Sequence, residues 1–381
     1  MKKICTLVLL LFSVVVLAKT TVVPPLVSDS SSQSAVAVRT PHDLTRQEII
    51  NILINGNYRP DFTLIASHRA QVVGVDLPEN SMSAIKNVAI HSPVEIIELD
   101  IKTSRDHIPY LMHDNYLQRT TNFVDNNPGI PDDQDYGKSV LQYPESMLKA
   151  LFLKLPDFSL TTESPPTFRE ALLWVKKNTQ LLINIDINDD AVFQDVWNVV
   201  KEENAFDVCI FKGGYSYSEF KTRFYDTLTD EQKNKLIYFP IIPGSTESNQ
   251  DKSLNFYHDW EKQPLQIAKG YEVGYRKDSP GAKFSNEAAL LNVVSDVRKV
   301  NRVRVNVFST LPDTYEGRYR GNVNINQCCN AVFDSRGDWQ YLLDPQNTHT
   351  LDKGVNGYII TDDPATLDMY LSGVGRRDLT N

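Results

Sequence analysis

The chain is 381 residues long and acidic, with 39 basic and 48 acidic side chains and a formal net charge of −9. This balance argues against a nucleic-acid partner, because proteins that bind nucleic acids usually present an excess of lysine and arginine. The length fits either two ordinary domains or one large α/β barrel, and it does not choose between them.

The first eighteen residues predict a signal peptide. Lys2 and Lys3 precede an apolar run over residues 4–17, and Ala18 supplies the small residue of a cleavage site. The run is short for a membrane anchor, and no second apolar run of about 18 residues follows it. We therefore expect a secreted or periplasmic protein that has no integral membrane segment after processing.

Residues 19–58 predict a leader and a short helix. Residues 19–40 are rich in Ser, Val and Thr without a helical period, which indicates a flexible leader, and residues 43–55 predict the helix. The main domain is expected over 59–373, with a tail over 374–381. Cys209, Cys328 and Cys329 are too few and too unevenly spaced for a disulfide framework. Cys209 lies in an apolar run and is expected to be an inert core thiol.

Apolar runs of strand length alternate with helical periods from residue 63 onward. The predicted strands are 63–67, 94–101, 181–187, 207–211, 236–242, 266–273, 302–309 and 357–361, with 108–112 as an extra hairpin arm. The predicted helices are 81–89, 168–178, 191–203, 286–300 and 365–371. Two of them carry start signals: Thr167 with Glu170 forms a capping box, and Asp363 precedes Pro364.

This alternation predicts an α/β fold with a mainly parallel sheet. Eight strands favour a closed TIM-type (β/α)8 barrel, and an open, doubly wound sheet is the alternative. The polar segments 122–166 and 311–356 are longer than ordinary barrel loops. We expect them to be insertions that form two long capping loops.

A hairpin carries the most distinctive polar residues. Glu98 and Asp100 lie two apart on a predicted strand and so share one face. A turn centred on Arg105 and Asp106 pairs residues whose numbers sum to about 211, which sets His113 roughly opposite Glu98. Two carboxylates on one face repel each other, so one interpretation is a bound hard cation; the other is a salt-bridged surface strand.

Other polar residues stand at the ends of the predicted strands. In a parallel barrel the carboxyl ends of the strands converge on one mouth. The residues read off there are His68 and Arg69, Glu98 and Asp100, His113, and Asp186 in the segment INIDIND. Three carboxylates and two histidines are therefore expected to face a common site.

Six segments, in this order, resemble the glycerophosphodiester phosphodiesterase family. They are ASHRA at 66–70, LPENSMSAI at 77–85, IELDIKTSRDHIPYLMHDNYLQRTT at 97–121, PPTFREAL at 165–172, INIDI at 183–187 and GYIITDDP at 357–364. A lone His-Arg or His-Asp pair is uninformative, whereas the ordered set over about 300 residues is specific.

The resemblance implies a fold, a metal and a set of roles. The fold is a TIM-type barrel, and the metal is a divalent cation, Ca²⁺ or Mg²⁺, bound at Glu98, Asp100 and Asp186. His68 and His113 would be the acid and base, and a hydroxyl of the substrate's glycerol would attack phosphorus.

Two further residues have expected roles at the phosphate of this small-molecule phosphodiester. Arg69 would clamp the phosphate in a bidentate manner. Glu79 would support Arg69 or a histidine; alternatively it is a helix-start carboxylate favoured by the helix dipole.

The sequence departs from the family pattern at three positions. Ala70 replaces a glycine, Asp186 replaces a glutamate, and Asn188 replaces a lysine. Asp186 is one methylene shorter than glutamate, so it would bind the metal at longer range or through water. Lys212 is a candidate to replace the lost lysine at the phosphate, against the alternative of a solvated lysine, which we favour on residue type.

Three hypotheses follow. The leading one is a secreted, metal-dependent phosphodiesterase that hydrolyses glycerophosphodiesters to glycerol phosphate and an alcohol. The second is a phospholipase D-type enzyme acting on lysophospholipids or sphingomyelin, because sphingomyelin-cleaving enzymes of related architecture use an aspartate as the third metal ligand. The third is a catalytically silent binding barrel, against which both histidines and the Glu98/Asp100 pair argue.

Overall fold

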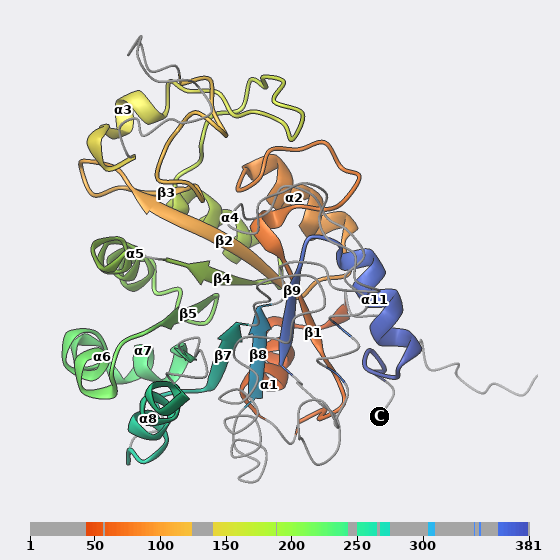
Figure 1. Ribbon diagram of the computed structural model, residues 1–381, viewed down its shortest axis with the longest axis vertical. Coiled ribbons are helices and arrows are strands. Elements are labelled where there is room, and N and C mark those ends of the chain that lie inside the picture. The colour runs from red at the N-terminus through yellow and green to blue at the C-terminus, as the bar shows by residue number, and fades with distance from the viewer. Residues whose placement is uncertain are drawn as a thin grey trace, which may run out of the picture. The chain divides into compact units, whose positions relative to one another are not determined.

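In the computed structural model, eight parallel strands close into a barrel (Figure 1). The structure describes residues 43–55, 58–123, 140–187, 189–242, 250–264, 267–274, 304–308, 339, 343 and 357–379. The description concerns the unit 39–381.

The barrel strands follow one another in chain order. They are β1 Leu64–Ser67, β2 Ile96–Thr103, β4 Leu182–Asp186, β5 Cys209–Gly213, β6 Ile237–Ile242, β7 Gly270–Gly274, β8 Arg304–Phe308 and β9 Tyr358–Thr361. Each pairs in parallel with the next, and β9 and β2 both pair with β1, which completes the ring. The predicted barrel is confirmed.

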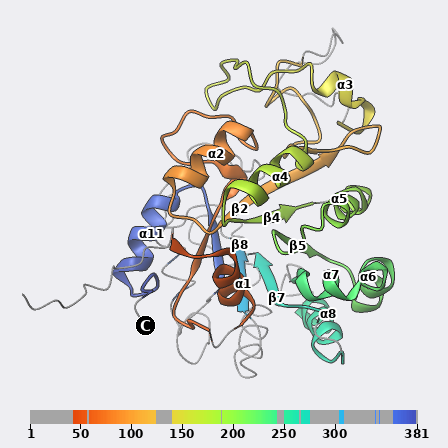
Figure 2. The ribbon, with the colours of Figure 1, turned by 180° about the vertical axis from the view of Figure 1, so that it is seen from behind.

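The strands are near-continuous apolar runs because both of their faces are buried. Alternate side chains point inward, so Leu64 and Ala66 belong to the interior core while Ile65 faces the helices. Helix α1, Arg46–Ile54, packs Ile52 and Leu53 against this interior core. The core is drawn mainly from the first residues of the strands, so α1 closes the amino-terminal end of the barrel (Figure 2).

The covering helices lie around the outside of the strands (Figure 1). They are α2 Met82–His91, α4 Phe168–Asn178, α5 Asp190–Glu202, α6 Tyr217–Arg223, α7 Asp230–Lys235, α8 Gln250–Glu261 and α11 Pro364–Gly373. Both start signals are confirmed: Thr167 and Glu170 form a capping box, and Asp363 accepts from the Thr366 amide. The helix predicted at 286–300 lies outside the described residues.

The hairpin arm β3, Pro109–Leu111, pairs antiparallel with β2. Ile101 pairs with Leu111 and Thr103 with Pro109, so the paired numbers sum to 212. The predicted register was one residue off, and Met112, not His113, follows in the ladder by donating its N–H to the Asp100 carbonyl at 2.9 Å.

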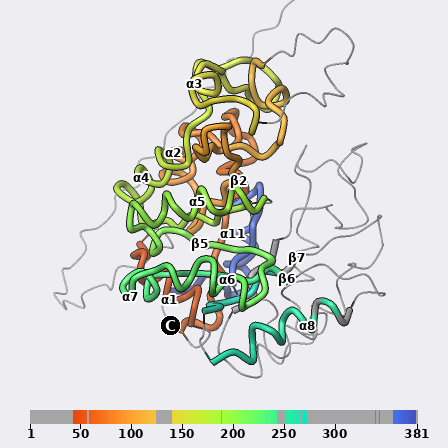
Figure 3. Tube along the Cα trace, turned by 90° about the vertical axis from the view of Figure 1, so that its left-hand side faces the viewer, coloured from red at the N-terminus to blue at the C-terminus, as the bar shows by residue number. Residues whose placement is uncertain are grey.

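The segment after β3 carries the 3₁₀ turn Val140–Gln142 and helix α3, Glu145–Leu148. It has a small core of its own, made by Tyr110, Met112, Leu117, Val140, Tyr143 and Leu148. Ser83 at the start of α2 donates its amide to Glu163 at 2.9 Å, which ties this segment to α2 (Figure 3). It is one of the two expected long loops; apart from Trp339 and Leu343, the other lies outside the described residues.

Contacts beyond the expected domain limits also hold the barrel. Besides α1, Arg377 near the C-terminus is buried and binds Glu95 at 2.8 and 2.9 Å. Among the described residues, no helix is long and apolar enough to cross a membrane.

Candidate active site

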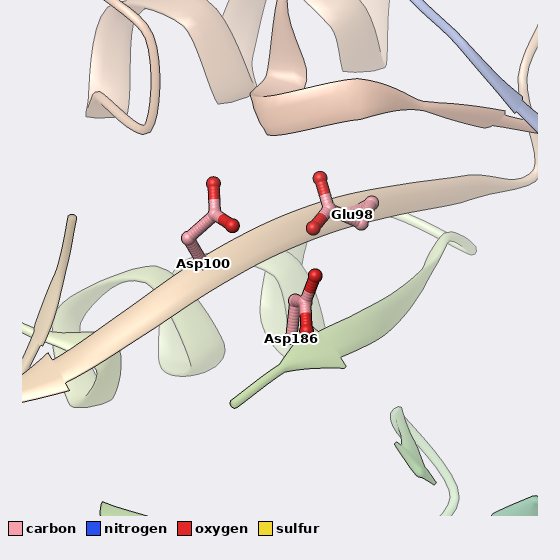
Figure 4. Close-up of side chains that lie close together, drawn as sticks. All are labelled: Glu98, Asp100 and Asp186. Atoms are coloured by element: carbon pink, nitrogen blue, oxygen red, sulfur yellow. The ribbon is translucent and has the colours of Figure 1, made fainter. Parts of the chain in front are cut away.

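Three carboxylates meet at the carboxyl end of the barrel strands. On β2, Ile96 contributes to the interior core, and Glu98 and Asp100 follow it on the same inward face. Asp186 ends the neighbouring β4 and is in register with Asp100. One oxygen of each carboxylate lies within 4.8 Å of the others, and Figure 4 shows Asp186 pointing toward the pair on β2.

Glu98 is the carboxylate with the least compensation. It is fully buried, and its Oε2 accepts the Arg69 amide at 2.7 Å. Its Oε1 has no hydrogen-bond partner among the described residues. Burial, followed by the charges of Asp100 and Asp186, raises the pKa of Glu98 well above its ordinary value. An orphan buried oxygen among three clustered carboxylates fits a divalent cation.

Asp100 is held in its charged form by its neighbours. Burial acts to raise its pKa, but the charges of Arg69, His113 and His68 outweigh burial and lower it. The Asn80 amide donates to Asp100 Oδ2 at 2.8 Å, and Asn80 Oδ1 accepts the Asp100 N–H at 3.1 Å. Asn80 was missed as a site residue, although it is the last residue of the PEN motif.

Lys212 on β5 is buried, so the solvated alternative was wrong. Its Nζ lies 2.9 Å from Glu272 Oε1 and 3.9 Å from Asp186 Oδ2. Burial acts to lower the pKa of Lys212, but the charges of Asp186, Glu272 and Glu98 raise it, so Lys212 stays positive. Burial also raises the pKa of Asp186, although Lys212 opposes that rise.

A polar chain inside the barrel holds the partner of Lys212. Glu272 accepts from the Tyr358 hydroxyl, and the Asn184 amide donates to the Tyr358 oxygen at 2.6 Å. None of these three was predicted. The only sequence signal was for Asn184, which lies two residues before Asp186 on β4 and therefore shares its inward face.

Both histidines are backed by carboxylates. His68 follows β1, and its Nδ1 lies 2.6 Å from Asp362 Oδ1. His113 Nδ1 lies 2.6 Å from Asp114 Oδ1. A carboxylate that accepts from Nδ1–H places the lone pair on Nε2, as acid/base chemistry requires. The sequence did not single out Asp362, because its neighbour Asp363 already accounts for an aspartate before Pro364 as the cap of α11.

Arg69 is arranged differently from the expected phosphate clamp. Its Nη1 lies 3.1 and 3.3 Å from the two Glu79 oxygens, and its Nε lies 3.2 Å from Asp100 Oδ2. The guanidinium is buried and held by carboxylates, so its contact with phosphate stays a prediction. Arg69 and Ala70 have φ values of 53° and 55°, which explains why glycine suits the position of Ala70.

Arg119 joins the two halves of this network. It donates to both oxygens of Glu79 at 2.6 and 2.9 Å and to Asp114 at 2.5 and 3.0 Å. An unbroken line of charged contacts thus runs from His113 to Arg69. Burial acts to raise the pKa of Glu79, but Arg69 and Arg119 lower it.

Asn188 lies outside the described residues, as do Cys328 and Cys329. Cys209 is a buried free thiol whose pKa is raised by burial. This agrees with an inert core cysteine.

The glycerophosphoryl diester phosphodiesterase family model matches residues 68–366, most of the chain. The chain belongs to this family. It is therefore a phosphoric diester hydrolase of the glycerophosphodiester phosphodiesterase type. The family is generally dependent on divalent metal ions, and the three carboxylates form an acidic cluster of the kind that such an ion needs. No curated protein matches the chain.

Solved structures of family members share the fold. A glycerophosphoryl diester phosphodiesterase from Parabacteroides distasonis aligns at TM-score 0.57 and 16% identity, covering 88% of this chain and 94% of that one. A candidate member from Silicibacter pomeroyi aligns at TM-score 0.52 and 14% identity, covering 87% and 99%. At such identities the likeness establishes the barrel, and the residue roles rest on the geometry.

Proposed function

We propose that the chain hydrolyses glycerophosphodiesters to glycerol phosphate and an alcohol, with a divalent cation at Glu98, Asp100 and Asp186. The observation that carries this proposal is the carboxylate cluster with its orphan Glu98 oxygen, at a barrel mouth that also holds two carboxylate-backed histidines. The hard carboxylate oxygens suit Ca²⁺ or Mg²⁺. When bound, such an ion would polarise the phosphoryl oxygens and offset their charge.

The histidines move the protons in this proposal. One takes the proton of the glycerol hydroxyl as that oxygen attacks phosphorus, and the other protonates the alcohol oxygen as its bond to phosphorus breaks. Water then opens the cyclic glycerol phosphate by the reverse proton movements. Asp362 and Asp114 keep the two imidazoles in the tautomer that this needs.

The positive groups of the site bind the phosphate. Lys212 keeps a charged ammonium beside Asp186 from the next strand, where it makes up for the lysine absent at 188. Arg69 adds its charge behind Asp100. Lys212 and Arg69 are each paired with carboxylates, and a cation held by the acidic cluster would offset those carboxylates and so strengthen the attraction of both residues for the phosphate.

We also propose that the protein acts outside the cytoplasm, in a secreted or periplasmic form. The support is the sequence of residues 1–18, with two lysines, an apolar run and Ala18. Amino-terminal sequencing of the protein recovered from culture medium or periplasm tests this, and an intact Met1 there would contradict it.

Hydrolysis assays with and without chelator test the function. We expect turnover of glycerophosphocholine to vanish in excess chelator and to return with Ca²⁺ or Mg²⁺. Full activity in excess chelator would show that the reaction does not need a metal ion. Lysophosphatidylcholine and sphingomyelin belong in the same panel, and a preference for either would favour the phospholipase D-type alternative.

His68→Ala and His113→Ala should each lower kcat by at least about 10²-fold. His91→Ala, at the exposed end of α2, is the matched control and should keep the wild-type rate. A near-normal rate in either folded site variant would mean that its imidazole is neither acid nor base.

A further inference from the structure

Lys212 lies between two carboxylates inside the barrel and contacts them unequally. Its Nζ donates to Glu272 Oε1 at 2.9 Å, although β7 is two strands away from β5 in the ring. Asp186 on the adjacent β4 lies 3.9 Å away, which is an ion-pair distance but too long for a hydrogen bond. Asp186 points instead toward Glu98 and Asp100 (Figure 4). The chain therefore directs this hydrogen bond of the ammonium to a residue outside the acidic cluster.

Glu272 is itself held in place from the interior of the barrel. It is buried, and it accepts from the Tyr358 hydroxyl. Burial, followed by the charge of Glu272, raises the pKa of Tyr358 well above its ordinary value, so the hydroxyl remains a donor. The Asn184 amide donates to the Tyr358 oxygen at 2.6 Å, which directs the hydroxyl proton to Glu272. Since the tyrosine ring packs in the interior core near Phe239, core residues fix the orientation of Glu272.

This arrangement affects the metal site, because a lysine beside a metal ligand competes with the metal. An ammonium that hydrogen-bonds Asp186 would occupy an oxygen that the cation needs, and its charge would repel the cation at short range. A buried ammonium requires a partner, so without Glu272 we expect Lys212 to turn to Asp186. A displacement of about 1 Å would bring the two into hydrogen-bond contact.

We propose that Glu272, Tyr358 and Asn184 form a positioning group that keeps Lys212 from hydrogen-bonding Asp186 and so leaves that carboxylate to the divalent cation. Glu272 supplies the acceptor for the ammonium, and Tyr358 and Asn184 fix the orientation of Glu272. The proposal rests on the metal site of the proposed function, and it gives these three residues a part in that site beyond the stability of the barrel.

Calorimetric titration of Ca²⁺ and Mg²⁺ into the metal-free, full-length protein and its variants tests this. Glu272→Gln should weaken binding at least about 10-fold, because Lys212 then bonds Asp186. Lys212→Met should bind the ion at least as tightly as the wild type, since a positive charge is removed. In the Lys212→Met background, the loss of affinity caused by Glu272→Gln should be at least about 5-fold smaller. An equal loss in both backgrounds overturns the proposal, because removal of the Glu272 charge then explains the whole effect.

Two milder variants separate the position of Glu272 from its charge. Glu272→Asp keeps the charge but withdraws the carboxylate by one methylene, and it should weaken binding about 5-fold or more. Tyr358→Phe keeps the ring in the core and removes the donor to Glu272, and it should weaken binding about 2- to 5-fold. Wild-type affinity in either variant overturns the proposal.

Tyr271→Phe is the matched control for Tyr358→Phe. Tyr271 is buried and stands next to Glu272 on β7, but its ring packs outside the barrel against Tyr257, with 5.1 Å between the ring centroids. The variant should bind the ion as the wild type does. Equal weakening by Tyr271→Phe and Tyr358→Phe would overturn the proposal, because loss of a buried tyrosine hydroxyl would then act through general loosening of the barrel.

The remaining outcomes separate this proposal from its alternatives. An ion pair that serves stability alone would lower the melting temperature of Glu272→Gln and leave metal affinity unchanged where the variant is folded, and that result overturns the proposal. A wild-type protein that binds neither Ca²⁺ nor Mg²⁺ would overturn the metal-dependent function itself. A wild type that binds the ion, with no dependence of the Glu272→Gln effect on Lys212, overturns the positioning role alone.

Discussion

Glu95 and Glu98 lie three residues apart around the start of β2, and both are almost fully buried, at 1% and 0% exposure. Their surroundings are opposite. Arg377 donates to both oxygens of Glu95 at 2.8 and 2.9 Å, and the Ile65 amide adds a third bond at 2.9 Å. Glu98 has one backbone donor, an orphan oxygen and two carboxylates as neighbours.

The difference between the two glutamates indicates that one end of the barrel serves stability and the other serves ligand binding. At the amino-terminal end the fold supplies a buried carboxylate with all the donors it needs. The shortage at Glu98 is therefore not a limit of what this chain can build. It marks a place where a ligand completes the charge balance, at the end of a TIM barrel where enzymes carry out their chemistry.

Arg377→Met should produce the largest effect, a loss of about 3–5 kcal/mol in the free energy of unfolding. The substitution leaves Glu95 buried without its cation, and urea unfolding measures the loss. The double variant with Glu95→Gln should recover part of it, because no charge is then left unpaired. Equal stability of wild type and Arg377→Met would show that this pair contributes nothing to the fold.

Glu98→Gln should preserve or raise the stability of the metal-free protein while strongly lowering its activity. The glutamine side chain keeps an acceptor for the Arg69 amide but carries no charge, so the metal-free variant should be as stable as the wild type or more so. Its metal-dependent activity should fall by at least about 10²-fold, in line with losing a ligand of the cation. Wild-type activity would exclude Glu98 from the site.

Asp186→Ala should weaken metal binding by about 10-fold or more, since it removes one ligand or its water-bridging partner. Asp186→Glu combined with Asn188→Lys restores the family pattern and should tighten metal binding while retaining activity. Metal titrations of both variants provide the comparison. Unchanged affinity in Asp186→Ala would exclude the residue and revive the silent-barrel hypothesis.

The pH dependence of stability should show that Glu98 lacks donors and positive charge around its carboxylate. The pKa of Glu98 is raised by folding, so its stabilising effect is complete below the ordinary value of 4.5 and is lost as pH rises toward the raised pKa. The slope for the metal-free protein should reach at most about 1.4 kcal/mol per pH unit.

Comparison with Glu98→Gln isolates this group. Glu79 has a lowered pKa, so its stabilising effect is lost in a different window, as pH falls below its ordinary value. Urea unfolding from pH 4.5 upward should therefore show the downward slope in the wild type and not in the variant. Identical slopes would contradict the account of Glu98.

The barrel was predictable because its strands are apolar on both faces and each of the eight stands out as a run. Helices α6, α7 and α8 were missed, since α6 and α7 are short and none of the three carries the long apolar stripe that reveals a covering helix. The hairpin register was wrong by one residue because turn geometry, not strand composition, sets it.

The site was predictable where residues sit on regular strands. Parity alone put Glu98 and Asp100 on one face, and strand order brought Asp186 beside them. Partners from distant segments were not predictable, because Asp362, Glu272 and Arg119 reach the site only through closure of the ring and the long segment after β3. The burial of Lys212 likewise depends on a partner that lies 60 residues further along the chain.

Calorimetric titration of Ca²⁺ and Mg²⁺ into the metal-free protein tests the central claim most directly. The account predicts one ion bound per chain, with protons released below the raised pKa of Glu98 because the ion displaces the proton from that carboxyl. The same titration of Glu98→Gln should show greatly weakened binding and no such release. No binding to the wild type, or equal binding to both proteins, would contradict a metal site at Glu98, Asp100 and Asp186.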